Sequence, residues 1–184
     1  MTCTTRKANF IECDSLNCKN MKCQNKFISG RGNYKLIITK QGSQGMGVKL
    51  GQNDRIDENI FIGEYTGQVR SRSAVEKNSS YSAKLSKNHV VDAKDSTNIL
   101  KYLNHSCFPN ARLEVWLSEG KLFMSIFYMK IKLTNFILLI VDGFPRICLF
   151  STRTIYANEW ITISYGKYAR EMFHEQKCTC EICD

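Results

Sequence analysis

Five short stretches of the chain concentrate apolar and β-branched residues, and each is bounded by glycine, asparagine or polar clusters. Runs of this length and composition are typical of strands rather than helices. We predict strands over residues 34–39, 60–66, 89–93, 146–155 and 160–165. The Gly-rich stretch QGSQGMGV (41–48) is predicted to be a turn, and residues 166–177 are the best helix candidate. No alternation of strands with long helices is visible, so we expect a mainly β fold.

Residues 121–141 form a longer apolar run, KLFMSIFYMKIKLTNFILLIV, which raises the question of a membrane span. Lys130 and Lys132 lie in its middle, where each charge would cost ~3 kcal/mol in a bilayer. Its most apolar part, 133–141, is too short to cross a bilayer as a helix. We therefore predict a buried pair of strands and no membrane association.

The composition indicates how many domains the chain forms and which class of partner it favours. The chain has 184 residues, of which 43% are hydrophobic, and this suffices for one domain with a small appendage. The chain opens with no secretory leader, so secretion is not expected. The formal net charge of +9 favours polyanionic surroundings such as nucleic acid or chromatin.

Nine cysteines without an export signal indicate a reducing compartment, in which clustered thiols bind zinc more often than they form disulfides. Cys3, Cys13, Cys18 and Cys23 lie in a polar N-terminal segment that would need metal to fold. The C-terminal CTCEICD offers the three thiols of Cys178, Cys180 and Cys183 to one tetrahedral zinc ion, and Cys107 is the natural fourth ligand. Cys148 lies within an apolar run and is predicted to be a core residue.

The stretch KYLNHSCFPN (101–110) gathers an amide, an imidazole, a hydroxyl and a thiol. Asn104 and His105 can bind a polar ligand, or they can form a locally satisfied turn before Pro109. A nucleophilic pair of Cys107 and His105 is disfavoured, because no third group to orient the imidazole is evident. Gly45 and Gly47 would let the backbone approach a ligand closely, although such triplets are most often turns.

Several motifs in order identify the chain as resembling the SET domain of protein-lysine methyltransferases. They are GMGVKL (45–50), FIGEYTGQV (61–69), VDA (91–93), NHSCFPN (104–110), ITISYG (161–166) and the Cys-rich tail. The resemblance implies a fold of small β-sheets wrapped around a pseudoknot. It divides the chain into a partial pre-SET region (1–26), a SET domain (27–166) and a post-SET zinc-binding tail (167–184).

The resemblance also implies roles for individual residues. S-adenosylmethionine would be held by Gly45, Met46, Gly47, Tyr81, Asn104 and His105. Tyr165 would be the catalytic tyrosine, assisted by Tyr81, at the mouth of a channel for the substrate lysine. Ile163 occupies the position that governs how many methyl groups fit. Structural zinc would be bound by Cys107, Cys178, Cys180 and Cys183 in the tail, and by the four N-terminal cysteines in an incomplete pre-SET cluster.

The implied substrate is the tail of histone H3 on the nucleosome, which places the protein in the nucleus, on chromosomes. FPRICLFSTRTI (144–155) is most similar to the heterochromatin class, which methylates lysine 9. The class that methylates lysine 36 shares the C-x-N pattern of Cys23 and Asn25 and is the alternative. The positive charge is assigned to nonspecific contact with nucleosomal DNA.

Departures from the family pattern keep a third possibility open, a degenerate SET module that binds cofactor or chromatin without turnover. Ile163 stands where an aromatic residue is usual, Ser164 replaces an aspartate, and Gln68 and Trp160 replace glutamates. The C-x-C-x2-C spacing of the tail is also tighter than usual. Residues 117–140 have no counterpart in the family pattern, and they are either a long hairpin insertion or untranslated sequence read into a gene model.

Overall fold

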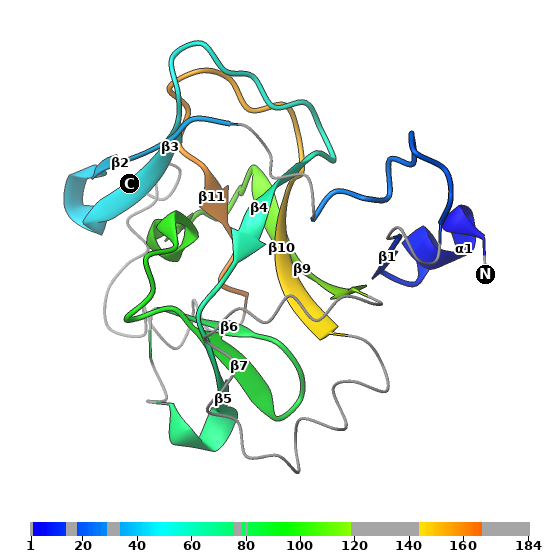
Figure 1. Ribbon diagram of the computed structural model, residues 1–184. Coiled ribbons are helices and arrows are strands. Elements are labelled where there is room, and N and C mark those ends of the chain that lie inside the picture. Colours follow the sequence, from blue (N-terminus) through cyan, green and yellow to red (C-terminus); the bar gives the residue numbers. More distant parts are fainter. Residues whose placement is uncertain are drawn as a thin grey trace.

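The computed structural model describes residues 2–13, 18–28, 34–75, 79, 81–118 and 144–166. Within these ranges the fold is mainly β, as predicted, with one short α-helix and three short 3-10 turns (Figure 1). Its helical elements are α1 (Cys3–Ala8), η1 (Gly42–Gln44), η2 (Arg72–Ala74) and η3 (Ile99–Tyr102). Its strands are β1 (Ile11–Glu12), β2 (Leu36–Lys40), β3 (Met46–Leu50), β4 (Phe61–Tyr65), β5 (Gln68–Ser71), β6 (Ser82–Lys84), β7 (His89–Asp92), β8 (Asn104–His105), β9 (Ala111–Ser118), β10 (Phe144–Ser151) and β11 (Thr162–Ile163).

These strands form four small sheets. The largest has the order β1-β9-β10-β4, in which β1 runs parallel to β9 and the other neighbours are antiparallel. A second sheet has the order β5-β7-β6, and β2 and β3 form a hairpin. The fourth sheet pairs β8 in parallel with β11. Figure 1 shows the β2–β3 hairpin and the N-terminal α1 on opposite sides of strands β4, β9 and β10.

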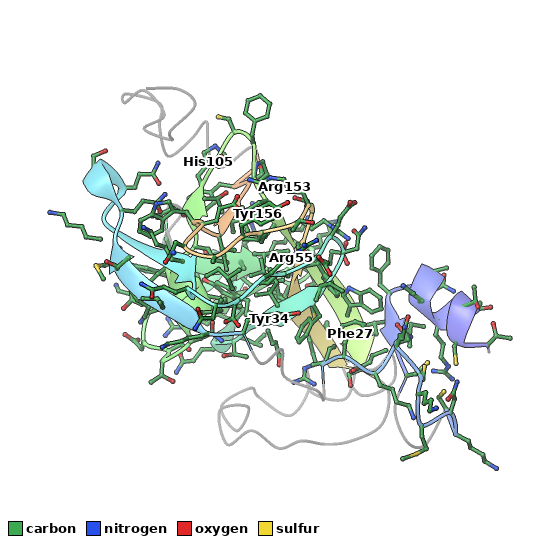
Figure 2. The ribbon with its side chains drawn as sticks, turned by 90° about the horizontal axis from the view of Figure 1, so that it is seen from above. Phe27, Tyr34, Arg55, His105, Arg153 and Tyr156 are labelled. Carbon is green, nitrogen blue, oxygen red and sulfur yellow. The ribbon has the colours of Figure 1, made fainter. Side chains whose placement is uncertain are left out.

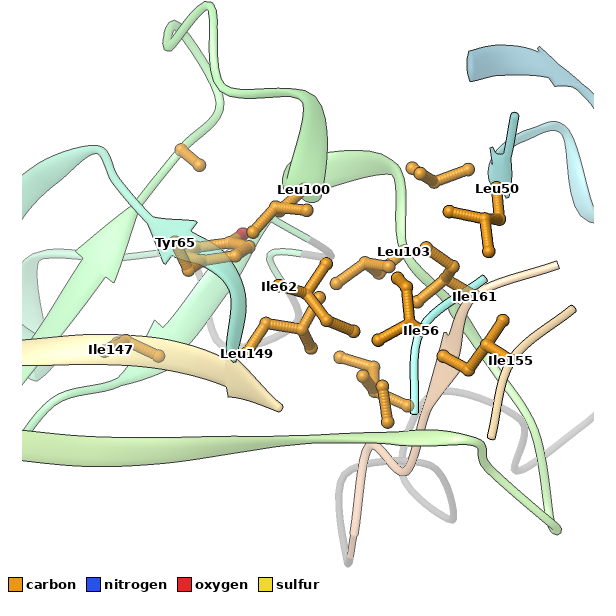
Figure 3. Close-up of a cluster of buried hydrophobic side chains, with 14 of the residues drawn as sticks. Leu50, Ile56, Ile62, Tyr65, Leu100, Leu103, Ile147, Leu149, Ile155 and Ile161 are labelled. Carbon is orange, nitrogen blue, oxygen red and sulfur yellow. The ribbon is translucent and has the colours of Figure 1, made fainter. Parts of the chain in front are cut away.

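The two faces of β10 carry separate clusters, because successive side chains in a strand point to opposite faces. Ile147 and Leu149 enter the main core, where they meet Ile62, Leu100 and other buried aliphatic residues (Figure 3). Cys148 and Phe150 enter a second cluster against the N-terminal segment. Each large aliphatic side chain buried in this way stabilises the fold by about 1.5–3 kcal/mol. The expectation that Cys148 is a core residue is confirmed, since its side chain is fully buried.

The strand predictions are correct in place and inexact in length. The predicted strand 160–165 is reduced to β11, and the predicted strand 146–155 ends at Ser151. The predicted turn 41–48 was too long, because β3 begins at Met46 and pairs with β2 through to the partners Leu36 and Leu50. The Gly-rich sequence concealed this strand, whose later positions are nonetheless buried.

Some predictions fall on residues that the structure does not describe. The helix predicted over 166–177 lies almost wholly outside the described residues, as do the apolar run 121–141 and the three cysteines of the tail. Among the described residues, no helix is long and apolar enough to span a membrane. Ser118 of β9 and Phe144 of β10 are paired in the register of these two strands.

Candidate active site

The site is built where two segments far apart in the sequence meet. In the β8–β11 pair, Asn104 is opposite Thr162 and His105 is opposite Ile163. The Ser106 amide extends this pairing by donating to the Ile163 carbonyl at 3.1 Å. The sequence gives only the order of the NHSC motif and the ITISY motif along the chain. In the structure the two motifs lie side by side in one two-stranded sheet.

Asn110 ties the same two segments together from inside the protein. Its side chain is 1% exposed, and its Nδ2 donates to Glu159 Oε1 at 3.0 Å and to the Trp160 carbonyl at 2.7 Å. Its Oδ1 accepts from the Thr162 amide at 2.9 Å. Because every polar atom of this buried amide has a partner, Asn110 holds β11 in register beside β8.

Tyr165 follows β11 and lies against the NHSC segment. Its hydroxyl donates to the Leu103 carbonyl at 2.8 Å, and its amide donates to His105 Nδ1 at 3.2 Å. The two rings are 5.3 Å apart between centroids. Accepting at Nδ1 requires neutral His105 to carry its proton on Nε2, and burial lowers the pKa of this imidazole. The neutral form is therefore favoured.

Two further tyrosines, Tyr65 and Tyr81, interact with Tyr165. Burial raises the pKa of Tyr165 to about 12, with a further contribution from Tyr81. Burial also raises the pKa of Tyr65, again with contributions from Tyr165 and Tyr81. The Tyr65 hydroxyl donates to the Tyr81 carbonyl at 2.7 Å and so connects β4 to the start of β6. Tyr81 itself is 36% exposed, which leaves its ring accessible to a ligand.

The loop between β2 and β3 closes one side of the site. Gly45 has a φ of +83°, which a residue with a side chain rarely adopts, and a Cβ there would meet nothing within 4 Å. A Cβ on Gly47 would overlap Gln41 Oε1 and would lie 2.9 Å from the Trp160 ring. Glycine at position 47 is therefore needed for packing, and Gly45 leaves open space beside the exposed Met46.

Asn104 links this loop to β8. Its Nδ2 donates to Gln41 Oε1 at 2.8 Å and to the Met46 carbonyl at 3.1 Å. No described residue donates to its Oδ1, so this oxygen can accept from a ligand. The open space at Gly45 and this acceptor fit S-adenosylmethionine, which carries N–H donors and needs close backbone approach. Gln41 was not among the predicted site residues.

Ile163 is buried, at 7% exposed, and belongs to the main core cluster, with Tyr165 packed against that cluster. Tyr165 lies two residues after Ile163, beyond the end of β11, and both residues contact the same cluster. Its role in setting methyl number stays a prediction.

The four N-terminal cysteines converge. The Sγ atoms of Cys3, Cys13, Cys18 and Cys23 all lie within 4.8 Å of one another. Cys3 Sγ is 3.3 Å from that of Cys18 and 3.8 Å from that of Cys23. Four thiolates around a tetrahedral zinc ion lie roughly 3.8 Å apart, given Zn–S bonds of about 2.3 Å. The cluster can therefore hold a zinc ion.

Aromatic packing attaches this cluster to the large sheet. The Trp116 ring of β9 has Phe27 at 4.7 Å and Phe10 at 5.4 Å between centroids, both edge-on. Beside them the Ile28 amide donates to buried Glu12 at 2.6 Å. Figure 2 shows Phe27 on the side of the N-terminal segment and His105 far from it, so the cluster is remote from the candidate site.

The second predicted zinc site is only partly visible. Cys107 is exposed, and its Sγ lies 3.7 Å from His105 Nε2. Its three predicted partners, Cys178, Cys180 and Cys183, lie outside the described residues. Zinc binding by this set stays a prediction, as does the division of the chain into three regions.

Comparison with known proteins gives the family. The SET domain model matches residues 47–166. Histone-lysine N-methyltransferase ASHH2 of Arabidopsis thaliana is 32% identical over 139 residues, covering 70% of this chain and 8% of that protein. Histone-lysine N-methyltransferase SUV39H2 of Gallus gallus is 28% identical over 166 residues, covering 84% and 36%. A Kluyveromyces lactis protein named histone-lysine N-methyltransferase, H3 lysine-36 specific, is 31% identical over 134 residues, covering 66% and 19%.

The chain spans well under half the length of each of these relatives. The family match nevertheless covers the loop at Gly47, both segments of the β8–β11 pair, and Tyr165. The chain belongs to the SET domain family.

Proposed function

We propose that this chain is a protein-lysine methyltransferase that uses S-adenosylmethionine to methylate histone H3. The observation that carries the proposal is the position of Tyr165, whose hydroxyl is fixed on the Leu103 carbonyl beside Asn104 and His105. Histone-lysine methyltransferases among the relatives support the substrate class. S-adenosylmethionine would supply the methyl group, attached to a sulfonium.

The chain's own residues would align the lysine amine and keep it neutral. The Tyr165 phenol stays protonated at neutral pH, because burial raises its pKa to about 12. Its hydroxyl donates to the Leu103 carbonyl, so its oxygen lone pairs are left to accept from the amine. A buried site also disfavours a charged ammonium and lowers the pKa of the lysine. Alignment of the reacting atoms accounts for most of the acceleration in such a site.

Asn104 and the loop at Gly45 would hold the cofactor. The free Oδ1 of Asn104 accepts a hydrogen bond, and Gly45 allows the backbone of the loop to approach closely. Neutral His105 keeps its ring against Tyr165. Together these residues would hold the cofactor beside Tyr165. Tyr165 and Tyr81 would then line the channel that admits the substrate lysine.

Lysine 36 of histone H3 is the first candidate target. It is supported by the relative from Kluyveromyces lactis, whose name gives lysine 36 of histone H3 as its target. Lysine 9 is the second candidate, supported by the resemblance of residues 144–155 to the heterochromatin class. The side chain of Ile163 is smaller than the usual aromatic residue, which favours more than one methyl transfer.

The nucleosome is the proposed form of the substrate, and the nucleus, at chromosomes, is the proposed location. A net charge of +9 does not complement a basic histone tail, and it is suited to contact with DNA phosphates. Nucleosome affinity should then fall steeply as salt is added. Affinity independent of salt would contradict this assignment.

A degenerate module that binds cofactor without turnover is the second candidate function. It is favoured by the departures from the family pattern at Ile163 and Ser164, the two residues that directly precede Tyr165. Binding of S-adenosylhomocysteine without methyl transfer to any histone would identify this case.

The deciding experiment uses the zinc-loaded full chain with S-adenosylmethionine and nucleosomes. Three nucleosome preparations are compared: one with unmodified histone H3, one with arginine in place of lysine 36, and one with arginine in place of lysine 9. We expect mass spectrometry to show methylation that only the lysine 36 replacement abolishes. Loss with the lysine 9 replacement alone would establish the second target, and methylation unaffected by either would exclude both.

A further inference from the structure

Gln41 occupies a constrained position at the start of the loop that leads into β3. Its side chain is buried, at 8% exposed. Its amide donates to the Gly45 carbonyl at 2.7 Å, and its own carbonyl accepts from the Gln44 amide at 2.9 Å. Both backbone groups are therefore committed to closing the loop. The side chain is left to lie between the loop and β8.

The side chain of Gln41 fills the space between Gly47 and Asn104. Its Oε1 lies so close to Gly47 that a Cβ there would overlap it, and it accepts from Asn104 Nδ2 at 2.8 Å. The Trp160 ring would also lie 2.9 Å from a Cβ on Gly47. A glutamine carbonyl packed in this way has little freedom to reorient, because both neighbouring elements restrict it.

The two acceptors around Asn104 fix which way its amide faces. The Met46 carbonyl can only accept, so the atom 3.1 Å from it must be the Asn104 nitrogen. Gln41 Oε1 accepts the second N–H of the same nitrogen. Reversing the amide would place Asn104 Oδ1 against two oxygens. Gln41 and Met46 together therefore leave Oδ1 as the outward, available atom.

We propose that Gln41 is a positioning residue for the cofactor: it holds the Asn104 amide so that Oδ1 accepts from an N–H group of S-adenosylmethionine. The inference rests on the proposed function, since it needs this cofactor. Gln41 does not touch the ligand in this account. It acts through Asn104, and its contribution is to keep the acceptor oriented before the ligand arrives.

The test compares three single variants of the zinc-loaded full chain. Gln41→Met removes the acceptor at nearly constant volume, and Gln41→Glu keeps an oxygen in the same place. Gln52→Met, in an exposed turn after β3, is the matched control. Calorimetry measures the Kd of S-adenosylhomocysteine, and thermal melting measures stability. Steady-state assays of methyl transfer measure the KM for S-adenosylmethionine and the KM for histone separately.

We expect Gln41→Met to raise the Kd of S-adenosylhomocysteine about 10-fold, the effect of losing one oriented hydrogen bond. Gln41→Glu should restore the Kd to near the wild-type value, and Gln52→Met should leave it unchanged. The KM for S-adenosylmethionine should rise with the Kd, and the KM for histone should not. On an Asn104→Ala background, Gln41→Met should add nothing, because its effect passes through Asn104.

Other results would overturn the inference. An unchanged Kd in Gln41→Met, an equal loss in Gln41→Glu, or additive losses in the double variant would each show that Gln41 only fills space. A wild-type chain that does not bind S-adenosylhomocysteine would overturn it too. A wild-type chain that binds without methyl transfer would contradict the proposed function alone, because the calorimetric comparison would still decide the role of Gln41.

Discussion

The hydroxyl of Tyr165 and the carbonyl of Leu103 are joined by a hydrogen bond of 2.8 Å. Leu103 immediately precedes the NHSC motif, and Tyr165 ends the ITISY motif. The bond therefore crosses from one half of the candidate site to the other. It depends on the β8–β11 pairing, which puts the backbones of the two motifs side by side.

The burial of Tyr165 predicts a loss of stability at high pH. Its pKa is raised from an ordinary value near 10 to about 12, so the folded state holds this proton more tightly than the unfolded state does. The stabilisation is fully present below pH 10 and is lost as the pH rises from about 10 to 12, with a total of about 3 kcal/mol.

Denaturant melts across this pH range measure that loss. Tyr165→Phe should show a smaller decline than the wild type, whereas Tyr156→Phe, at an exposed position, should decline in parallel with it. Equal declines in all three proteins would mean that Tyr165 ionises as freely as an exposed phenol.

Asn110 should be among the residues most sensitive to substitution in the described part of the chain. Asn110→Ala removes three hydrogen bonds and leaves the part-buried Thr162 amide and Trp160 carbonyl without the partners that Asn110 gives them. We expect a loss of about 3 kcal/mol in the free energy of unfolding. Asn98→Ala, which also removes side-chain bonds but from a more exposed site, should cost less. A smaller loss at Asn110 than at Asn98 would contradict its role as a clamp.

Gly47→Ala should weaken cofactor binding as well as destabilise the fold. The added methyl group would displace Gln41 Oε1 or the Trp160 ring, and overpacking of this kind costs about 1–3 kcal/mol. Because Gln41 holds Asn104, the Kd of S-adenosylhomocysteine should rise at least roughly 10-fold. Gly63→Ala is the control, since its Cβ meets only the flexible end of Leu100 at 3.3 Å. Equal effects of the two substitutions on the Kd would contradict this account.

Removal of zinc should release the N-terminal segment from β9. Trp116 is 4% exposed because Phe10 and Phe27 cover it, and both belong to the segment that the four cysteines organise. In a Trp160→Phe background, which leaves Trp116 as the remaining tryptophan, a strong chelator should shift the emission to longer wavelength. Readdition of zinc should reverse the shift.

Zinc content provides the matching control for that experiment. Cys13→Ser should lose one equivalent of zinc per chain, whereas Cys148→Ala, which removes a buried thiol outside the cluster, should lose none. A chelator that strips the metal without changing the Trp116 emission would show that the aromatic contacts hold the segment unaided.

The strands near the site could be predicted because their pattern is local. Residues 60–66 and 89–93 are β-rich runs between polar turns, and they form β4 and β7. Helix α1 was missed because it has no buried face, although Thr2 caps it and Arg6 and Lys7 lie in its last turn. β3 was missed because its glycines are typical of a turn.

The contacts of the site could not be predicted from local pattern. The meeting of Asn104 with Thr162, and of Leu103 with Tyr165, depends on how four small sheets pack, which no single segment encodes. Resemblance to a family supplied the residue types at Asn104, His105 and Tyr165. It gave no sign of Gln41, whose importance comes from the space left by Gly47 and appears only when both are placed together.

The most direct test is mass spectrometry of intact histone H3 after incubation with the zinc-loaded chain and S-adenosylmethionine. Wild type and Tyr165→Phe are compared, once calorimetry has shown that both bind S-adenosylhomocysteine equally. The account predicts added methyl groups with the wild type and a rate lower by roughly 100-fold or more with Tyr165→Phe. Equal methylation by the two proteins, or none by a wild type that binds the cofactor product, would contradict it.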